Sequence, residues 1–257
     1  MTLNKINLNS DLAEHDFQFY LKVDKPIILN INSANISCLY HGGRKEVVEE
    51  AIIECIRKDV SIGAHISFLD KENFGRTQLE WDENSIHALL REQIDILSSI
   101  CKNHKVFITH FKLHGALSNM ASKDLRLAQT IVSYFKSQYP NLIILAPVLS
   151  ELAKASQSSG LKTALEVFAD RTYEDDGTLT PRSLAGSVIT NPKDIVGNLR
   201  VMIEKKVIVS RTGLELSAKF NSICIHSDTP NSVEISRQIC LLLNSMNLSQ
   251  NKLTDLF

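Results

Sequence analysis

Histidines, acids and a lysine fall close to the ends of the apolar runs in this 257-residue sequence. In KLHGALSN, Lys112 and His114 are two residues apart, so on an extended strand both would point to the same side. That pair suits chemistry in which a cation holds an anion while a neighbouring imidazole moves a proton. The alternative is a lysine that leans into solvent beside a capped helix.

Three further segments have the same character. GAHISFLDKENFGRT places His65 at the end of an apolar run and follows it with Asp70 and Arg76, although a surface turn capped by Asp70 would have the same sequence pattern. ICIHSDTP places His226 and Asp228 ahead of a helix start, where backbone amides favour an anion. EVFADRTYEDDGTLTPRS is a long charged loop of the kind that is either simply solvated or a lid over an active site.

The sequence leaves a metal site unassigned. Histidine and carboxylate ligands for a divalent ion could come from Asp11, His41, His65, His114 and His226. The sequence has no HExxH motif or similarly close spacing of ligands, so it does not favour a metal site over the absence of one. Its five cysteines are spread singly along the chain, which predicts reduced thiols and argues against a disulfide framework or a thiolate zinc site.

The elements that would position these groups alternate between strand-like and helix-like patterns. Seven short β-rich runs predict strands, and several are apolar nearly throughout, as strands covered on both faces should be: Lys5–Leu8, Ile27–Ile31, Val60–Ile66, Val106–Leu113, Leu142–Leu145, Ala164–Phe168 and Ser222–Ile225. Helical periodicity predicts helices after Arg44, after Asp82 and after Ser122, and another over Val233–Leu243. Thr229 is expected to cap the last helix, with a proline at the first helical position.

This order predicts one parallel α/β domain over residues 1–257, an irregular (β/α) barrel of about seven strands. The alternative is an open doubly wound sheet, which would usually carry a glycine-rich phosphate loop after its first strand, where this chain reads NSDLAEHD. In a parallel barrel the carboxyl ends of all strands open on one face. Residues as distant as Asp11 and His226 should therefore meet around one cavity.

Composition limits the other classes of function. The 28 lysines and arginines balance 29 acidic residues, so we expect no general attraction to nucleic acid or to an anionic membrane. No apolar run approaches the roughly 18 residues that would span a bilayer. The N-terminal segment MTLNKINLNSDLAEHDF lacks the features of an export signal, so we expect a cytoplasmic protein.

Taken together, these motifs resemble those of the LamB/YcsF family. The likeness is collinear over nearly the whole chain, through LNSDLAE, SANISCLYHGG, GAHISFLDKENFGR, KLHGALSN, EVFADRTYEDDGTLTPRS and ICIHSDTP. The resemblance implies an irregular (β/α) barrel related to the glycoside hydrolase/deacetylase group. It also implies ATP-dependent opening of a small-molecule substrate, 5-oxoproline, to L-glutamate, by a 5-oxoprolinase whose A subunit works with partner subunits B and C.

The resemblance further implies roles for individual residues. The side chains expected to take part in catalysis are Asp11, His65, Lys112, His114 and Glu166. Those expected to bind substrate or nucleotide are Glu14, Asn35, His41, Asp70, Arg76, Asn119, Asp170, Arg171, Arg182, His226 and Asp228. ATP would be a co-substrate, bound together with magnesium. A bound transition metal and a homo-oligomer both stay open.

The expected chemistry begins with phosphorylation of the lactam oxygen by ATP, which makes the ring carbon electrophilic toward water. Lys112 and Arg76 would hold phosphate oxygens or the substrate carboxylate, and Asp11 or His114 would be the base for the water. The chain departs from the usual family pattern at Arg44, where an aspartate is common. Two alternatives are a metal-dependent carbon–nitrogen hydrolase or deacetylase on the same barrel, and a non-catalytic regulatory or binding relative.

Overall fold

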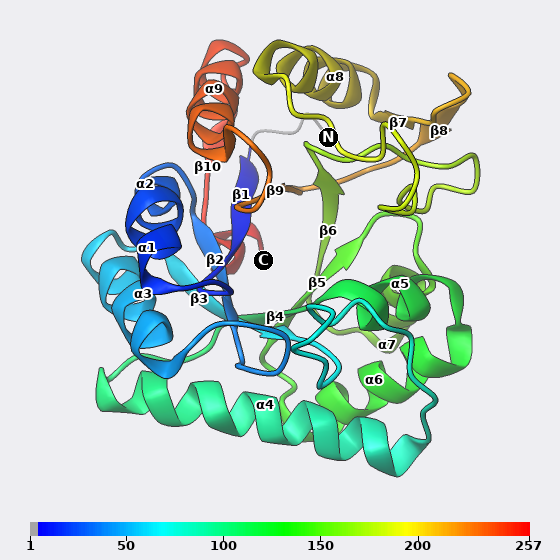
Figure 1. Cartoon of the computed structure of the whole chain (residues 1–257). Coiled ribbons are helices and arrows are strands. Elements are labelled where there is room, and N and C mark those ends of the chain that lie inside the picture. Colours follow the sequence, from blue (N-terminus) through cyan, green and yellow to red (C-terminus); the bar gives the residue numbers. More distant parts are fainter. Residues whose placement is uncertain (1–4) are drawn as a thin grey trace.

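Seven parallel strands close into a barrel within residues 5–257, the part of the chain that the structure, a computed structural model, describes (Figure 1). They are β1 (Lys5–Leu12), β2 (Ser33–Ser37), β3 (Ser61–Ile66), β4 (His110–Leu113), β5 (Ile143–Pro147), β6 (Thr163–Phe168) and β9 (Ser222–His226). Strand β9 pairs with both β6 and β1, and its register places His226 opposite Asp11. The predicted irregular (β/α) barrel is confirmed. Residues 1–4 of the segment considered for an export signal lie outside the described residues.

Helices connect the strands and cover the outside of the barrel (Figure 1). The longer ones are α3 (Lys45–Arg57), α4 (Glu83–Asn103), α5 (Gly115–Lys123), α6 (Leu125–Gln138), α7 (Glu151–Ser159), α8 (Pro192–Lys205) and α9 (Ser232–Ser245). The short ones are α1 (Phe17–Phe19), the π-helix η1 (Tyr20–Asp24), α2 (Lys25–Ile28) and the 3-10 helix η2 (Leu253–Leu256). Among residues 5–257, no helix combines the length and apolar character needed to cross a membrane.

Two small strand features complete the chain. The antiparallel hairpin of β7 (Val207–Val209) and β8 (Glu215–Ser217) precedes β9. Strand β10 (Ser249–Gln250) pairs in parallel with the start of β1, so the C-terminal segment lies at the amino end of the barrel. There Leu253 packs with Ile143, Leu145 and Ala164 in a small buried cluster.

Most inward side chains of the barrel are polar, apart from the small apolar cluster around Leu253 at its amino end, whereas the outer faces of the strands pack on apolar helix faces. Asn35 of β2 accepts a hydrogen bond from His110 of β4 at 3.0 Å, although β3 lies between these two strands. Only side chains that point inward can meet in this way. The outward side chains, such as Leu8, Ile36 and Phe111, belong instead to the main hydrophobic core.

One predicted strand is wrong. The run Ile27–Ile31 is not a strand, because residues 25–28 form helix α2, which continues directly from the π-helix η1. The second strand is β2 instead, with the sequence SANIS. Its small polar side chains face the barrel interior, so it does not stand out in the sequence as an apolar run.

Two predicted helix starts are also wrong. Ser122 lies inside α5, and the next helix, α6, begins after Asp124, whose carboxylate accepts the amide N–H groups of Arg126 and Leu127. Helix α9 begins after Asn231 rather than Thr229. The Thr229 hydroxyl donates to the buried Asp170 carboxylate, which accounts for its placement away from the helix cap. Helices after Arg44 and Asp82 are confirmed.

Candidate functional site

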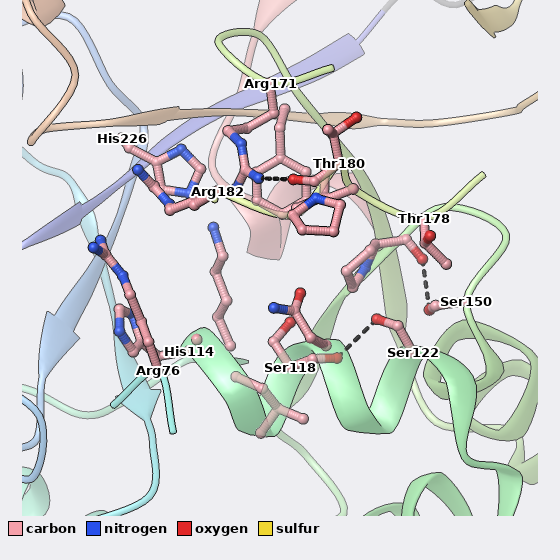
Figure 2. A pocket seen from close by; sticks show the side chains of 18 of the residues that line it. Arg76, His114, Ser118, Ser122, Ser150, Arg171, Thr178, Thr180, Arg182 and His226 are labelled. Atoms are coloured by element: carbon pink, nitrogen blue, oxygen red, sulfur yellow. Dashed lines mark hydrogen bonds between the residues drawn. The ribbon is translucent and has the colours of Figure 1, made fainter. Parts of the chain in front are cut away.

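A cavity of about 350 Å³ opens at the carboxyl ends of the barrel strands. Figure 2 shows Arg171, Arg182 and His226 on one side of it, and Ser118 and Ser122 of α5 on the other. Of the site residues expected from the sequence, those that line the cavity are Asp11, Glu14, His65, Arg76, Lys112, His114, Asn119, Arg171, Arg182, His226 and Asp228. Those outside the lining are Asn35, His41, Asp70, Glu166 and Asp170.

Lys112 is the centre of a buried charge network. Its Nζ lies 3.0 Å from Asp11 Oδ1, 3.2 Å from Glu166 Oε2 and 3.0 Å from Cys224 Sγ. Burial alone would lower the pKa of Lys112, but the facing Asp11, Cys224 and Glu166 raise it well above its ordinary value. The side chain is therefore an ammonium ion, and its donors are directed at protein groups.

The two carboxyl groups that share this ammonium ion have pKa values shifted in opposite directions. Burial works to raise the pKa of Asp11, but His65, Lys112 and His226 outweigh it and hold that pKa below its usual range. Burial raises the pKa of Glu166, and Lys112 offsets this only in part. Asn35 also donates to Asp11 Oδ1 at 2.8 Å. Asp11 is therefore ionised, and two donors hold it in place.

His226 and Asp170 form a hydrogen-bonded pair at the cavity wall. His226 Nδ1 donates to Asp170 Oδ1 at 2.9 Å, and Thr229 donates to the same carboxylate. Burial favours a higher pKa for Asp170, but His226 and Thr229 together lower it. Because Nδ1 carries the proton, His226 Nε2 has a free lone pair, and it lies 3.9 Å from Asp11 Oδ2. This arrangement can accept a proton from a molecule in the cavity.

Three histidines and Glu14 meet beside Asp11, whose Oδ2 lies 3.4 Å from His65 Nε2. We call them the histidine cluster: Glu14, His41, His65 and His114. Glu14 Oε1 lies 2.7 Å from His41 Nε2, 3.5 Å from His65 Nε2 and 3.3 Å from His114 Nδ1. Burial lowers the pKa of His41 to about 3 and that of His114 to about 4. Burial also raises the pKa of Glu14 to about 7. This is one of two groups among the described residues whose ligand atoms lie close enough together to hold a metal ion.

A left-handed turn in the loop after β3 covers the histidine cluster. Phe74 has a φ of 56° and Gly75 a φ of +66°. A Cβ atom at Gly75 would lie 2.8 Å from His41 Cβ and 3.0 Å from His114 Cδ2, so glycine lets the loop come close to both rings. The Phe74 carbonyl then accepts a hydrogen bond from His114 Nε2 at 2.9 Å.

Arginines surround the cavity opening. Arg76 and Arg182 lie 3.1 Å and 3.8 Å from Asp228, and all three side chains are partly exposed. Arg171 is different, because it is buried and donates to the backbone carbonyl of Thr180 at 2.5 Å (Figure 2). It also donates to the carbonyl of Ser187 at 3.0 Å. Arg76 and Arg182 can therefore bind an anion, whereas Arg171 holds the loop that follows β6.

Asp70, an expected site residue, and Arg44, the departure from the family pattern, both have local roles. Asp70 accepts the amide N–H groups of Asn73 and Thr77 and so orders the loop after β3, which is the surface-turn alternative. Arg44 is exposed at the N-cap of α3, away from the cavity lining, so the reversed charge there does not enter the site.

Sequence reasoning missed several residues that the site uses. His110 precedes Lys112 by two residues on β4, and this alternation could have placed it on the same inward face. The sequence indicates Cys224 only as a reduced thiol, and it does not single out Ser67. Ser67 and Phe74 contribute through loop contacts, for which the sequence carries no spacing signal.

A closed parallel barrel with a polar cavity at the carboxyl ends of its strands is the arrangement of (β/α)-barrel enzymes. The model of the LamB/YcsF family matches residues 6–256. The chain belongs to the LamB/YcsF family, as its motifs suggested.

Relatives and a solved structure are similar over nearly the full length. The chain is 37% identical over 244 residues to the 5-oxoprolinase A subunit of Clostridium beijerinckii, covering 95% of this chain and 96% of the relative. It is 34% identical over 253 residues to the 5-oxoprolinase A subunit of Halalkalibacterium halodurans, covering 98% of both. The crystal structure of the lactam utilization protein from Thermus thermophilus superposes with a TM-score of 0.86 at 30% identity, covering 96% of this chain and 99% of that one.

Proposed function

We propose that this chain is the A subunit of an ATP-dependent 5-oxoprolinase, which opens 5-oxo-L-proline to L-glutamate while ATP is cleaved to ADP and phosphate. The proposal is supported by full-length similarity to relatives of that name. The observation that carries it is the meeting of the His226–Asp170 pair and two arginines around one cavity of about 350 Å³. A cavity of this size suits a small molecule.

ATP has a clear chemical purpose in this reaction. A five-membered lactam is a resonance-stabilised amide, so water attacks it slowly. Transfer of the γ-phosphoryl group to the lactam oxygen makes the ring carbon electrophilic. Water then adds to this carbon, the ring C–N bond breaks with protonation of the nitrogen, and a second water releases phosphate from the resulting acyl phosphate. One ATP and two waters thus give glutamate, ADP and phosphate.

We assign the base for the attacking water to His226. Its Nε2 faces the cavity, and Asp170 stabilises the imidazolium that forms. His114 fits this role less well, because its Nε2 donates to the Phe74 carbonyl and its Nδ1 faces the histidine cluster. Asp11 is ionised 3.9 Å from His226 Nε2 and supports the same imidazolium.

Arg76 and Arg182 are assigned to the phosphate oxygens or the substrate carboxylate. Both are partly exposed at the cavity, and their shared partner Asp228 leaves guanidinium donors free for a bidentate contact. Lys112 acts indirectly, since its ammonium group fixes Asp11. ATP would enter as its magnesium complex.

We place this chain in an assembly with subunits B and C of 5-oxoprolinase, because its relatives are named as the A subunit of that enzyme. All five cysteines are free thiols, which agrees with a reducing compartment such as the cytoplasm. A homo-oligomer within that assembly is compatible with this placement.

The test is reconstitution of the chain with both partner subunits, followed by measurement of ATP-dependent glutamate release from 5-oxoproline. We expect the complete assembly to turn over and the isolated chain to show little activity. His226→Gln should lower kcat by about 10²–10⁴-fold. The matched control is His87→Gln, a histidine outside the cavity lining, which should leave kcat unchanged. Absence of glutamate release from the complete assembly would refute the function, and full activity of His226→Gln would refute the base assignment.

A further inference from the structure

The four ligand atoms of the histidine cluster converge on one point. Besides the three contacts to Glu14 Oε1, His65 Nε2 lies 2.9 Å from His114 Nδ1. All four atoms lie within 4.8 Å of one another. The side chains of His41, His65 and Glu14 are almost completely buried, so bulk water does not separate these groups.

Neighbouring groups fix where two of the three rings carry their protons. Ser67 Oγ donates to the Phe68 carbonyl at 2.9 Å, so its remaining contact, at 2.8 Å, must accept the proton of His41 Nδ1. His114 Nε2 likewise donates to the carbonyl of Phe74 at 2.9 Å. The second nitrogen of each neutral ring therefore carries a lone pair. These nitrogens are His41 Nε2 and His114 Nδ1.

Both of these lone pairs point at the same carboxyl oxygen of Glu14. His41 Nε2 is 2.7 Å from Glu14 Oε1, and His114 Nδ1 is 3.3 Å from it. Three acceptors that face one another at these distances repel unless a proton or a cation lies among them. Within the described chain no lysine or arginine forms an ion pair with Glu14.

We propose that the histidine cluster binds one divalent transition-metal ion, with Zn²⁺ as the best match. Three imidazole nitrogens and one carboxylate oxygen form a donor set that zinc favours. Ligands on a tetrahedral zinc ion lie about 3.3 Å apart, and the contacts of 2.7–3.5 Å to Glu14 Oε1 bracket this spacing. The outer hydrogen bonds from His41 to Ser67 and from His114 to Phe74 are of the kind that orient metal-bound histidines.

A second set of possible metal ligands near the cavity already has the positive charge of Lys112 beside it. Asp11, Cys224 and His226 also bring ligand atoms together. However, Lys112 Nζ lies 3.0 Å from both Asp11 Oδ1 and Cys224 Sγ, so an ammonium ion already supplies the positive charge. This contrast favours the histidine cluster as the metal site.

The position of the cluster gives the ion access to the cavity. Glu14, His65 and His114 line the cavity, whereas His41 lies behind them. An ion held here would form part of the cavity wall, where a water molecule could add as a fifth ligand. The inference does not depend on lactam opening, because metal binding is measured without substrate.

The experiment is a metal titration of the full-length chain. The purified protein is treated with a chelator, dialysed and titrated with Zn²⁺ by calorimetry, and with Co²⁺ by visible absorption, which reports tetrahedral coordination. We expect one ion per chain and a higher thermal unfolding midpoint with Zn²⁺ bound. An unchanged midpoint together with no saturable binding would overturn the proposal.

Variants locate the ion. Glu14→Gln keeps the size of the side chain, and its amide can donate to His41 Nε2, so the fold should be retained while zinc affinity falls by more than about 100-fold. Ser67→Ala removes only the acceptor for His41 Nδ1 and should weaken binding by about 10–100-fold. The matched control, His226→Gln, should bind zinc as the unchanged chain does. Zinc binding that survives Glu14→Gln, or is lost in His226→Gln, would place the ion elsewhere and refute the site.

Discussion

At the level of single residues, the cavity depends on buried charges whose partners come from strands far apart in the sequence. Lys112 of β4 neutralises Asp11 of β1 and Glu166 of β6. Such a network is costly to assemble, but removal of one partner is costlier still because the remaining charges stay buried.

We therefore expect Lys112→Gln to lower the free energy of unfolding by about 3–5 kcal/mol. Denaturant unfolding monitored by circular dichroism gives this value. Glu166→Gln is the informative comparison, because Glu166 already has a raised pKa and its amide analogue would leave Lys112 paired with Asp11. It should cost clearly less, and equal losses for both variants would contradict this account of the network.

The buried carboxyl group of Asp24 should make the free energy of unfolding depend on pH. It is buried, it accepts the amide N–H of Ala13 at 2.9 Å, and burial raises its pKa to about 7. The folded state thus binds this proton more tightly than the unfolded state does, so the contribution of Asp24 to stability is greatest at low pH. That contribution is lost as the pH rises from about 4 to about 7.

Asp24→Asn removes this ionisation and keeps an acceptor for the Ala13 amide. Between pH 5 and pH 8, the stability of the variant relative to the unchanged chain should increase by roughly 2–3 kcal/mol. Thermal or denaturant unfolding at both pH values checks this difference. A constant difference between the two proteins would show that Asp24 does not titrate in this range.

At the level of elements, helix α3 begins without a side-chain cap. Arg44 occupies its N-cap position and makes no capping hydrogen bond, and its positive charge opposes the helix dipole. Arg44→Asp should therefore raise the free energy of unfolding by about 1 kcal/mol. Urea unfolding midpoints provide the measurement, and Arg44→Ala separates removal of the charge from the gain of a cap. No gain from aspartate over alanine would refute the capping argument.

Sequence patterns predicted some strands of the barrel and missed others. Strand β3 is predictable because Ile62, Ala64 and Ile66 give it an apolar outer face. Strand β2 is not, because its inward side chains are Ser33, Asn35 and Ser37 and only Ala34 and Ile36 are apolar. The sequence indicated that His41, His65 and His114 gather at strand ends. It did not indicate that Glu14 contacts all three rings, since that depends on the left-handed turn at Ala13, whose φ is 62°.

At the level of the whole molecule, the amino end of the barrel is closed by the last residues of the chain. Leu253 is fully buried against Ile143, Leu145 and Ala164. Leu253→Ala should lower the free energy of unfolding by about 2–5 kcal/mol, through lost burial and the space left behind. Unfolding by denaturant measures this loss. Leu256→Ala, at a partly buried neighbour, should cost less, and equal losses would argue against Leu253 as the main plug.

The fold of the whole molecule made it possible to predict that Asp11 and His226 lie at one cavity. The hydrogen-bond partners of the site residues could not be predicted. Alternation of strands and helices suffices to predict a parallel barrel, and a parallel barrel brings all carboxyl ends to one face. The proton positions within the site depend on Ser67, Phe74 and Thr229, which lie in loops whose paths follow from packing rather than from periodicity.

The pairing of β1 with β9 has a consequence for synthesis on the ribosome. Strand β1 emerges first, yet its partner begins at Ser222, so a nascent chain that ends before β9 has an unpaired edge on both β1 and β6. Such edges are where growing polypeptides associate wrongly with one another. Shielding of those edges until the closing strand has left the exit tunnel would limit this wrong association.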